Sequence, residues 1–158
     1  ARDAYAKAVK LSADDTDLSV EYAESMVRTS PDHSFPPEAI VMLEKAVAKD
    51  ADNGSAMASL FSALLILGEP ERAKEWARRA VLIDPDNLGM RYNLACDLVV
   101  GLKDHDMALD MLEPVFRAGG REQMAWISAD PDMDAIRDKP RFKALLAAAE
   151  RRIATSNG

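Results

Sequence analysis

The stretch Ala73–Asn87, which reads AKEWARRAVLIDPDN, has an upstream counterpart in Ala39–Asn53, AIVMLEKAVAKDADN. A fixed offset of this size is typical of proteins built from stacked helical repeats. In both copies small or apolar residues recur every three or four positions, which places them on one face of a helix. They are Ala39, Leu43 and Ala46 in the first copy and Ala73, Ala77 and Ala80 in the second. We therefore expect two equivalent helices that pack closely through this face.

Each copy ends in turn-forming residues, which mark the end of its helix. The downstream copy closes with Asp84, Pro85, Asp86 and Asn87. Proline cannot continue a helix, and Asp or Asn can cap the next one. The residue equivalent to Asn87 in the upstream copy is Asn53. Each copy is therefore predicted to be one helix of a helix-turn-helix unit.

The segment Gly54–Asn87 resembles a tetratricopeptide repeat, a helix-turn-helix unit whose period matches the offset between the two copies. The residues that match the family's register are Met57, Leu60, Leu64, Gly68, Ala73, Ala80 and Pro85. Phe61 departs from the pattern, because the family usually has a small residue there, and we expect a locally wider helix pair. The resemblance implies an all-α fold, a right-handed superhelical solenoid of about three repeats that serves as a scaffold for protein binding.

The composition limits the classes of function. Of the 158 residues, 48% are hydrophobic and 30% are charged, which indicates a folded domain rather than a disordered chain. The longest apolar run, Ala63–Leu67, is far too short to span a membrane. The net charge of -7 disfavours binding to a nucleic-acid backbone and mildly favours a neutral or basic partner. The single cysteine, Cys96, excludes an internal disulfide.

The register divides the chain, which we expect to be a single tetratricopeptide domain, into five parts. They are 1–15, the second helix of a truncated repeat; 16–53, a repeat with a loop insertion; 54–87, the clearest repeat; 88–120, a third repeat; and 121–158, an atypical end with a capping helix. Ala1, Tyr5 and Ala8 reproduce the spacing of the packing face. The chain is therefore expected to begin inside a repeat and to be a piece of a longer protein.

Three irregularities in the register carry structural predictions. The turn-rich insertion Ser30–Pro37 lengthens one loop, and its residues His33 and Phe35 either pack locally or touch a partner. The third repeat has one extra residue in the loop Gly101–Asp106. Pro114 lies near the end of the second helix of that repeat, where we expect a kink or an early termination.

The last part resembles the tail of bacterial repeat arrays, in which a tryptophan, an Asp-Pro, an Asp-x-x-Arg and an Arg-Phe-x-x-Leu follow the last repeat. Here these are Trp126, Asp130 with Pro131, Asp134 to Arg137, and Arg141 to Leu145. An apolar helical stripe contains Phe142, Leu145, Leu146, Ala149 and Ile153, and the opposite face contains Arg141, Lys143, Glu150, Arg151 and Arg152. Because an end repeat needs a polar outer face, a helix over Pro140–Ala154 is predicted to cap the solenoid.

Motifs for catalysis, cofactor binding and metal binding are not found. The two histidines have no cysteine or third histidine that completes a metal site with them. Asp130, Asp132 and Asp134 resemble the start of a calcium loop, but Ala135 and Arg141 stand where that loop requires Gly and Glu. We interpret these acids as helix-end caps. Since no Gly-rich phosphate loop and no nucleophile elbow occurs, we expect no enzyme, no cofactor and no metal.

The resemblance implies that the first helix of each repeat lines a concave groove. The groove residues that we predict to bind a partner are Val20, Glu24, Arg28, Ala58, Ser62, Tyr92, Asn93 and Cys96. Tyr92 is the only large aromatic residue among the groove residues and is the first choice of contact residue. Many apolar groove positions can instead pack on the next repeat. Asn93 alone resembles a member of the lysine-asparagine clamp with which some family members hold a chaperone carboxylate.

The sequence therefore predicts a protein-protein interaction module that binds a peptide or helix in its groove, as part of a larger bacterial protein. One alternative is self-association, a homodimer formed through the face of Ala1, Tyr5 and Ala8. Another is a regulatory domain of a tethered signalling enzyme such as a cyclase. The expected partner is a protein or peptide, without nucleic acid or membrane insertion. The expected compartment is the cytoplasm, with the periplasm as the alternative.

Overall fold

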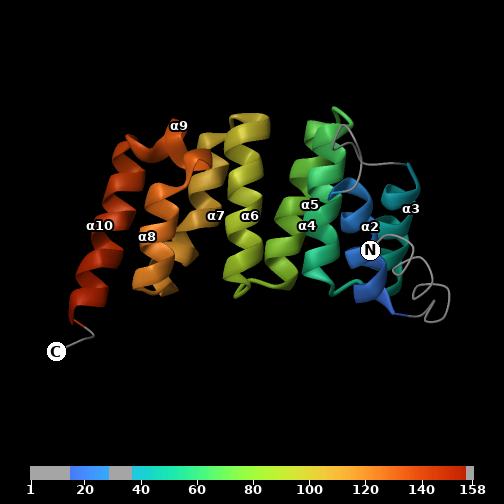
Figure 1. Cartoon of the computed structure of the whole chain (residues 1–158), viewed down its shortest axis with the longest axis horizontal. Coiled ribbons are helices and arrows are strands. Elements are labelled where there is room, and N and C mark those ends of the chain that lie inside the picture. The colour runs from blue at the N-terminus through green and yellow to red at the C-terminus, as the bar shows by residue number, and fades with distance from the viewer. Residues whose placement is uncertain (1–14, 29–36, 156–158) are drawn as a thin grey trace. The chain divides into compact units, whose positions relative to one another are not determined.

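The computed structural model describes residues 15–28 and 37–155. Every regular element in these ranges is helical (Figure 1), which confirms the predicted all-α helical repeat class. The chain divides into two compact units, residues 1–85 and 86–158. The right-handed superhelix and the single domain stay predictions.

Two groups of predictions concern residues outside the described ranges. The first group is the truncated opening helix with Ala1, Tyr5 and Ala8, which would carry the self-association face. The second is the loop insertion with His33 and Phe35. Both stay predictions.

In its described part, the N-terminal unit consists of helices that pack in sequence order. They are α2 (Thr16–Arg28), α3 (Pro37–Lys49), α4 (Gly54–Ile66) and α5 (Pro70–Ile83). Each helix packs on the next, and α2 also contacts α4. The first helices of two successive hairpins therefore lie side by side (Figure 1). Pro37 and Pro70 stand at the start of α3 and α5, where the missing N–H costs no helical hydrogen bond.

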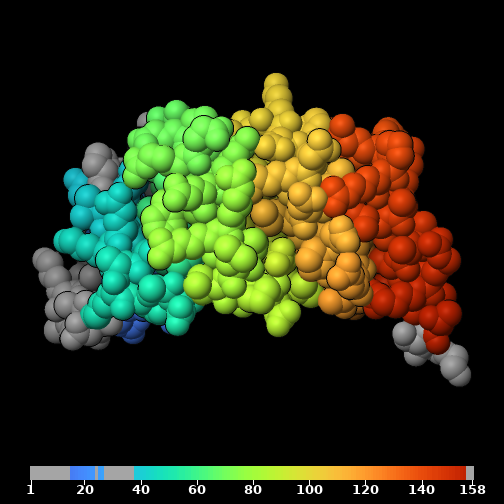
Figure 2. Space-filling view, turned by 180° about the vertical axis from the view of Figure 1, so that it is seen from behind, coloured from blue at the N-terminus to red at the C-terminus, as the bar shows by residue number. Residues whose placement is uncertain are grey.

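The C-terminal unit begins with a hairpin and ends with a helix that packs back on it. Its elements are α6 (Leu88–Asp97), the π-helix η1 (Leu98–Leu102), α7 (His105–Ala118), α8 (Arg121–Ala129), the 3₁₀-helix η2 (Pro131–Met133), α9 (Asp134–Arg137) and α10 (Pro140–Thr155). Helix α6 packs on α7, and α10 packs on α7 and α8. Figure 2 shows the red side chains of α10 directly against the orange ones of the preceding helices. The predicted capping helix is present.

Two asparagines one period apart begin the first helices α4 and α6 in the same way. The side-chain oxygen of Asn53 accepts a hydrogen bond of 2.9 Å from the N–H of Ala56. The side-chain oxygen of Asn87 accepts one of 2.9 Å from the N–H of Met90. Each bond satisfies an N–H that has no acceptor within its helix. The repeated asparagine is therefore a helix cap, as predicted.

The face that repeats between α3 and α5 is buried. Its residues are Ala39, Leu43, Ala46, Ala73, Ala77 and Ala80, and all of them are buried. Because most of them are methyl side chains, the neighbouring backbones can approach closely, and a larger residue would force them apart. This burial confirms the packing face that the repeat period predicts.

The extra residue of the third repeat lies in a π-helical turn at the end of α6. The carbonyl of Leu98 accepts hydrogen bonds from the N–H groups of Lys103 and Asp104. One period earlier, the carbonyl of Leu64 accepts only from Glu69 among the loop residues. A π turn holds one residue more than an α turn. The insertion thus lies in the helix and not in the loop, where the sequence placed it.

Pro114 does not end α7. The helix continues to Ala118, so the early termination is wrong, and the alternative of a kink stays a prediction. Val115 and Phe116, which follow the proline, are fully buried. Their packing holds the last turn in helical conformation, since tertiary packing supplies most of the stability of a helix in a protein.

An aromatic pair fixes α10 to α7. The rings of Phe142 and Phe116 meet edge to face, with centroids 5.3 Å apart and an interplanar angle of 87°. Both side chains are 1% exposed. Aromatic pairs in this arrangement contribute stability beyond the apolar area that they bury. Phe142 is therefore the residue that attaches the capping helix to the hairpin below it.

Two arginines of α10 also reach back to α7. Arg141 pairs with Asp110 at 2.7 Å and with Glu113 at 3.0 Å. Arg152 donates to the carbonyls of Phe116 and Gly119 where α7 ends, and thus satisfies groups that lack a helical donor. Arg141 is exposed, as predicted for the polar face, whereas Arg152 is half-buried against the end of α7, so its predicted outward placement is wrong. Both stand at the edge of the apolar stripe, and their long side chains extend over the neighbouring helix.

Candidate functional site

The predicted groove residues lie on three helices. They are Val20, Glu24 and Arg28 on α2, Ala58 and Ser62 on α4, and Tyr92, Asn93 and Cys96 on α6. The side chains of Glu24 and Arg28 lie outside the described residues. Val20 is 5% exposed. It therefore belongs to the core of the N-terminal unit and offers almost no surface to a partner.

In the N-terminal unit, the described groove residues that reach the surface are Ala58 and Ser62. Both are half-buried. The hydroxyl of Ser62 donates 3.4 Å to the carbonyl of Ala58, one helical turn earlier. This part of α4 therefore offers a small and uncharged surface.

In the C-terminal unit, Trp126 of α8 covers Tyr92. The two ring centroids are 4.6 Å apart, with an interplanar angle of 38°. Tyr92 is 3% exposed, whereas Trp126 is 57% exposed. The Tyr92 hydroxyl donates to the Oδ2 atom of Asp130. The ring that a partner can reach is therefore Trp126, and Tyr92 supports it from below.

Asp130 connects this aromatic pair to the turn that follows α8. Its Oδ1 atom accepts a hydrogen bond of 2.9 Å from the backbone N–H of Asp132, which caps η2. Its backbone carbonyl accepts one of 2.7 Å from the guanidinium of Arg137, which also pairs with Asp134 at 2.8 Å. The predicted capping role is confirmed for Asp130. We refer to Tyr92, Trp126, Asp130 and Asp132 together as the Trp126 surface.

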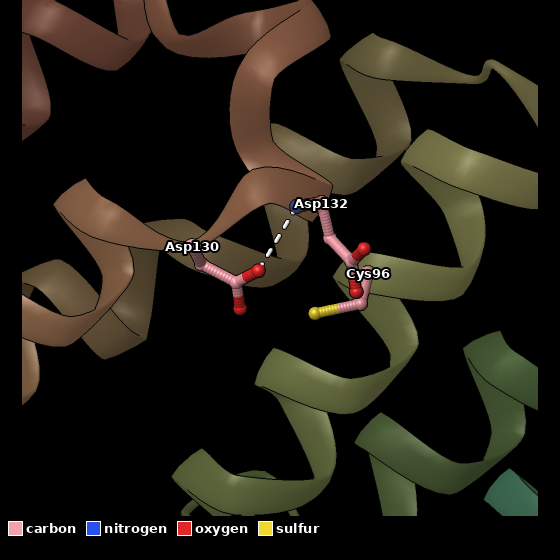
Figure 3. A group of neighbouring side chains, drawn as sticks. All are labelled: Cys96, Asp130 and Asp132. Atoms are coloured by element: carbon pink, nitrogen blue, oxygen red, sulfur yellow. Dashed lines mark hydrogen bonds between the residues drawn. The ribbon is translucent and has the colours of Figure 1, made fainter.

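Cys96 lies one turn after Tyr92, next to the carboxylates of Asp130 and Asp132 (Figure 3). Its sulfur and one oxygen of each carboxylate all lie within 4.8 Å of one another. Burial, together with the negative charges of Asp132 and Asp97, raises the pKa of the Cys96 thiol to about 12. The thiol is therefore protonated at neutral pH, which makes it a poor nucleophile.

These three side chains are close enough to share a metal ion, a grouping that the sequence did not predict. Two observations explain the cluster without a metal ion. Both oxygens of Asp130 already accept hydrogen bonds, from Tyr92 and from Asp132. The protonated thiol would have to lose its proton before it could bind a metal. We therefore interpret the cluster as part of the helix-capping turn.

Alkylation of Cys96 by iodoacetamide should be slow and should accelerate with pH. Only the thiolate reacts, and with a pKa of about 12 its fraction rises about tenfold per pH unit from about pH 8 to about pH 11. Asp132→Asn removes a negative charge beside the thiol, so it should lower the pKa and increase the rate at a given pH. Mass spectrometry gives both rates. Equal rates at about pH 8 for the native and the urea-unfolded protein would contradict the expectation.

A family model described as tetratricopeptide repeat matches residues 36–90. This range contains the complete α4–α5 hairpin, in which the repeat register is clearest. Residues 36–90 therefore belong to the tetratricopeptide repeat family. No curated protein and no solved structure matches it. Tetratricopeptide repeats are scaffolds for protein-protein interaction, so a protein partner is the general expectation for this chain. Among the described residues, no helix is both long and apolar enough to cross a membrane.

Trp126, Asp130 and Asp132 lie beyond the tetratricopeptide repeat match and are not among the predicted groove residues. The repeat period indicates two of these residues, Trp126 and Asp130. Trp126 follows Tyr92 by one full repeat period, and Asp130 follows Cys96 by the same interval. We therefore interpret α8 as the first helix of one more repeat, in the part of the chain whose sequence is atypical. Asp132 lies in η2, beyond that helix, and only the fold brings it to the same place.

Proposed function

We propose that this tetratricopeptide repeat protein is a non-catalytic scaffold that binds a peptide or a helix of a partner on the exposed face of its first helices, as part of a larger bacterial protein. The observation that carries the proposal is the exposed ring of Trp126, which Tyr92 and Asp130 hold in place. Aromatic residues fixed by packing dominate the binding energy of many protein interfaces.

A peptide or a helix suits the side chains on these first helices. Ala58 and Ser62 are small, so a partner backbone can approach α4 closely. Trp126 supplies a large anchor that loses little conformational freedom on binding, because its ring is already stacked. Close approach along small residues and one aromatic anchor are features of peptide recognition by helical surfaces.

The remaining parts of the proposal rest on the sequence and the family. The net charge of -7 disfavours a nucleic-acid partner. The usual use of tetratricopeptide repeats as scaffolds favours a binding role over catalysis. A cytoplasmic location is part of the proposal. Self-association through Ala1, Tyr5 and Ala8 concerns residues outside the described ranges.

A photo-crosslinking amino acid at Asn93 or at Ser62 tests the proposal. Asn93 is exposed on α6 beside the Trp126 surface, and Ser62 is half-buried on α4. The matched control is Arg78, which is exposed on the second helix α5. In a lysate of the source cells, we expect a partner to be crosslinked from Asn93, from Ser62 or from both, but not from Arg78.

The purified partner should then bind the unmodified protein in a calorimetric titration. Crosslinking of equal strength from all three positions would indicate non-specific capture and contradict the proposal. Absence of any crosslink from both first-helix positions would contradict it as well.

A further inference from the structure

We propose that the Trp126 surface binds a lysine or arginine side chain of the partner protein, with the ring of Trp126 and the carboxylate of Asp132 as its two contacts. The inference rests on the proposed scaffold function and specifies the chemistry of the partner. The family match does not imply it, because it depends on side chains of the last helices, which lie beyond residues 36–90.

The chain contains its own example of how a tryptophan on a helix surface binds a cation. In the N-terminal unit, the guanidinium carbon of Arg79 lies 5.2 Å from the ring centroid of Trp76. Trp126 is the more exposed of the two rings. Within residues 15–28 and 37–155, no cation lies over Trp126. Tyr92 stacks on one part of the ring, and the exposed part can receive a cation from another molecule.

The charges around the ring favour a cation over an anion or a neutral group. Asp132 is exposed and forms no ion pair with any described residue. One oxygen of its carboxylate lies within 4.8 Å of a carboxylate oxygen of Asp130, so two acidic side chains stand together at this place. Arg137 of α9, which follows Asp132 in the sequence, is held by the carbonyl of Asp130 and the carboxylate of Asp134. Asp132 is therefore the carboxylate that remains to pair with an incoming charge.

The two contacts are arranged through a chain of fixed groups. The ring of Trp126 stacks on Tyr92, and the Tyr92 hydroxyl binds Asp130. Asp130 in turn holds the backbone of Asp132. Because each group is fixed by the next, the ring of Trp126 and the backbone of Asp132 are held in place before a partner arrives. Ordered contacts cost less entropy on binding than mobile ones, and a cation that meets an aromatic face and a carboxylate together gains from both.

A random peptide display library, selected on the full chain, tests the inference. We expect the peptides selected by the unmodified protein to be enriched in lysine or arginine. The affinity of a selected peptide is then measured by calorimetry. Asp132→Asn and Trp126→Leu should each weaken it by about 3- to 30-fold. Trp126→Phe keeps a ring on Tyr92 and should have an intermediate effect.

A matched control is Asp106→Asn, which removes the same charge from an exposed position at the start of α7. Asp106→Asn should change the affinity for the selected peptide by no more than about twofold relative to the unmodified protein. Circular dichroism verifies that each variant is folded.

Selected peptides without lysine or arginine would overturn the inference. So would basic peptides whose affinity is the same for Asp132→Asn, Trp126→Leu and the unmodified protein. A selection that enriches no peptide would overturn it too. In each of these cases, crosslinking from Asn93 decides separately whether the scaffold function holds.

Discussion

Phe142→Ala should lower the free energy of unfolding of the C-terminal unit by about 3–5 kcal/mol, because it deletes a buried ring and leaves a cavity between α10 and α7. The ring is 1% exposed and meets Phe116 edge to face, so the aromatic pair is lost as well. Urea denaturation gives the change. In a Trp76→Phe background, Trp126 is the single tryptophan and reports the C-terminal unit alone.

Lys143→Ala is the matched control for this variant. Lys143 is the next residue on α10, is exposed, and pairs with Asp138 at the surface. Surface pairs of this kind contribute little, so the free energy of unfolding should change by no more than about 0.5 kcal/mol. A loss of less than about 1 kcal/mol for Phe142→Ala would contradict its role in attaching the capping helix.

Phe61→Ala should lower the free energy of unfolding of the N-terminal unit by about 3–5 kcal/mol, although it introduces the small residue that the family usually has there. Phe61 is 0% exposed, so the core of the unit has formed around the ring. A small residue at this position stabilises only a helix pair that is spaced for it. Here it would leave a cavity that the neighbouring helices can close only in part.

Urea denaturation in a Trp126→Phe background, in which Trp76 of α5 reports the N-terminal unit, measures the effect. Ile66→Ala is the control, since Ile66 is also a large apolar residue of α4 but is 52% exposed. Ile66→Ala should lower the free energy of unfolding much less than Phe61→Ala does. Unchanged or increased stability in Phe61→Ala would mean that α4 and its neighbours close around a small residue. The expectation of a wider helix pair would then be wrong.

Local residue patterns predicted most helices in the described ranges. The prolines at the start of α3, α5 and α10 and the asparagines before α4 and α6 act within one helical turn of themselves. The apolar spacing of three and four likewise depends only on the geometry of a single helix. For this reason the helices and their packing faces could be read before any tertiary contact was known. Two local expectations are wrong, the early termination at Pro114 and the extra residue in the loop Gly101–Asp106. Helix α7 continues to Ala118, and the extra residue lies in the π-helix η1.

The candidate site could be predicted only in part. The family register led to Tyr92 and Cys96, and both lie at the site. It did not show that Tyr92 would be buried and that Trp126 would be the exposed ring. A helical period tells which residues share a face, but not which of them the next helix covers.

The sequence by itself determined the helical repeat, its caps and the small residues through which the helices pack, because these depend on neighbours within a few residues. Only the tertiary structure decided that Tyr92, Trp126, Asp130 and Asp132 form one surface, and that Arg141 and Arg152 turn back to α7. Most of these contacts join residues that are far apart in the sequence, and their geometry is set by how whole helices pack against one another.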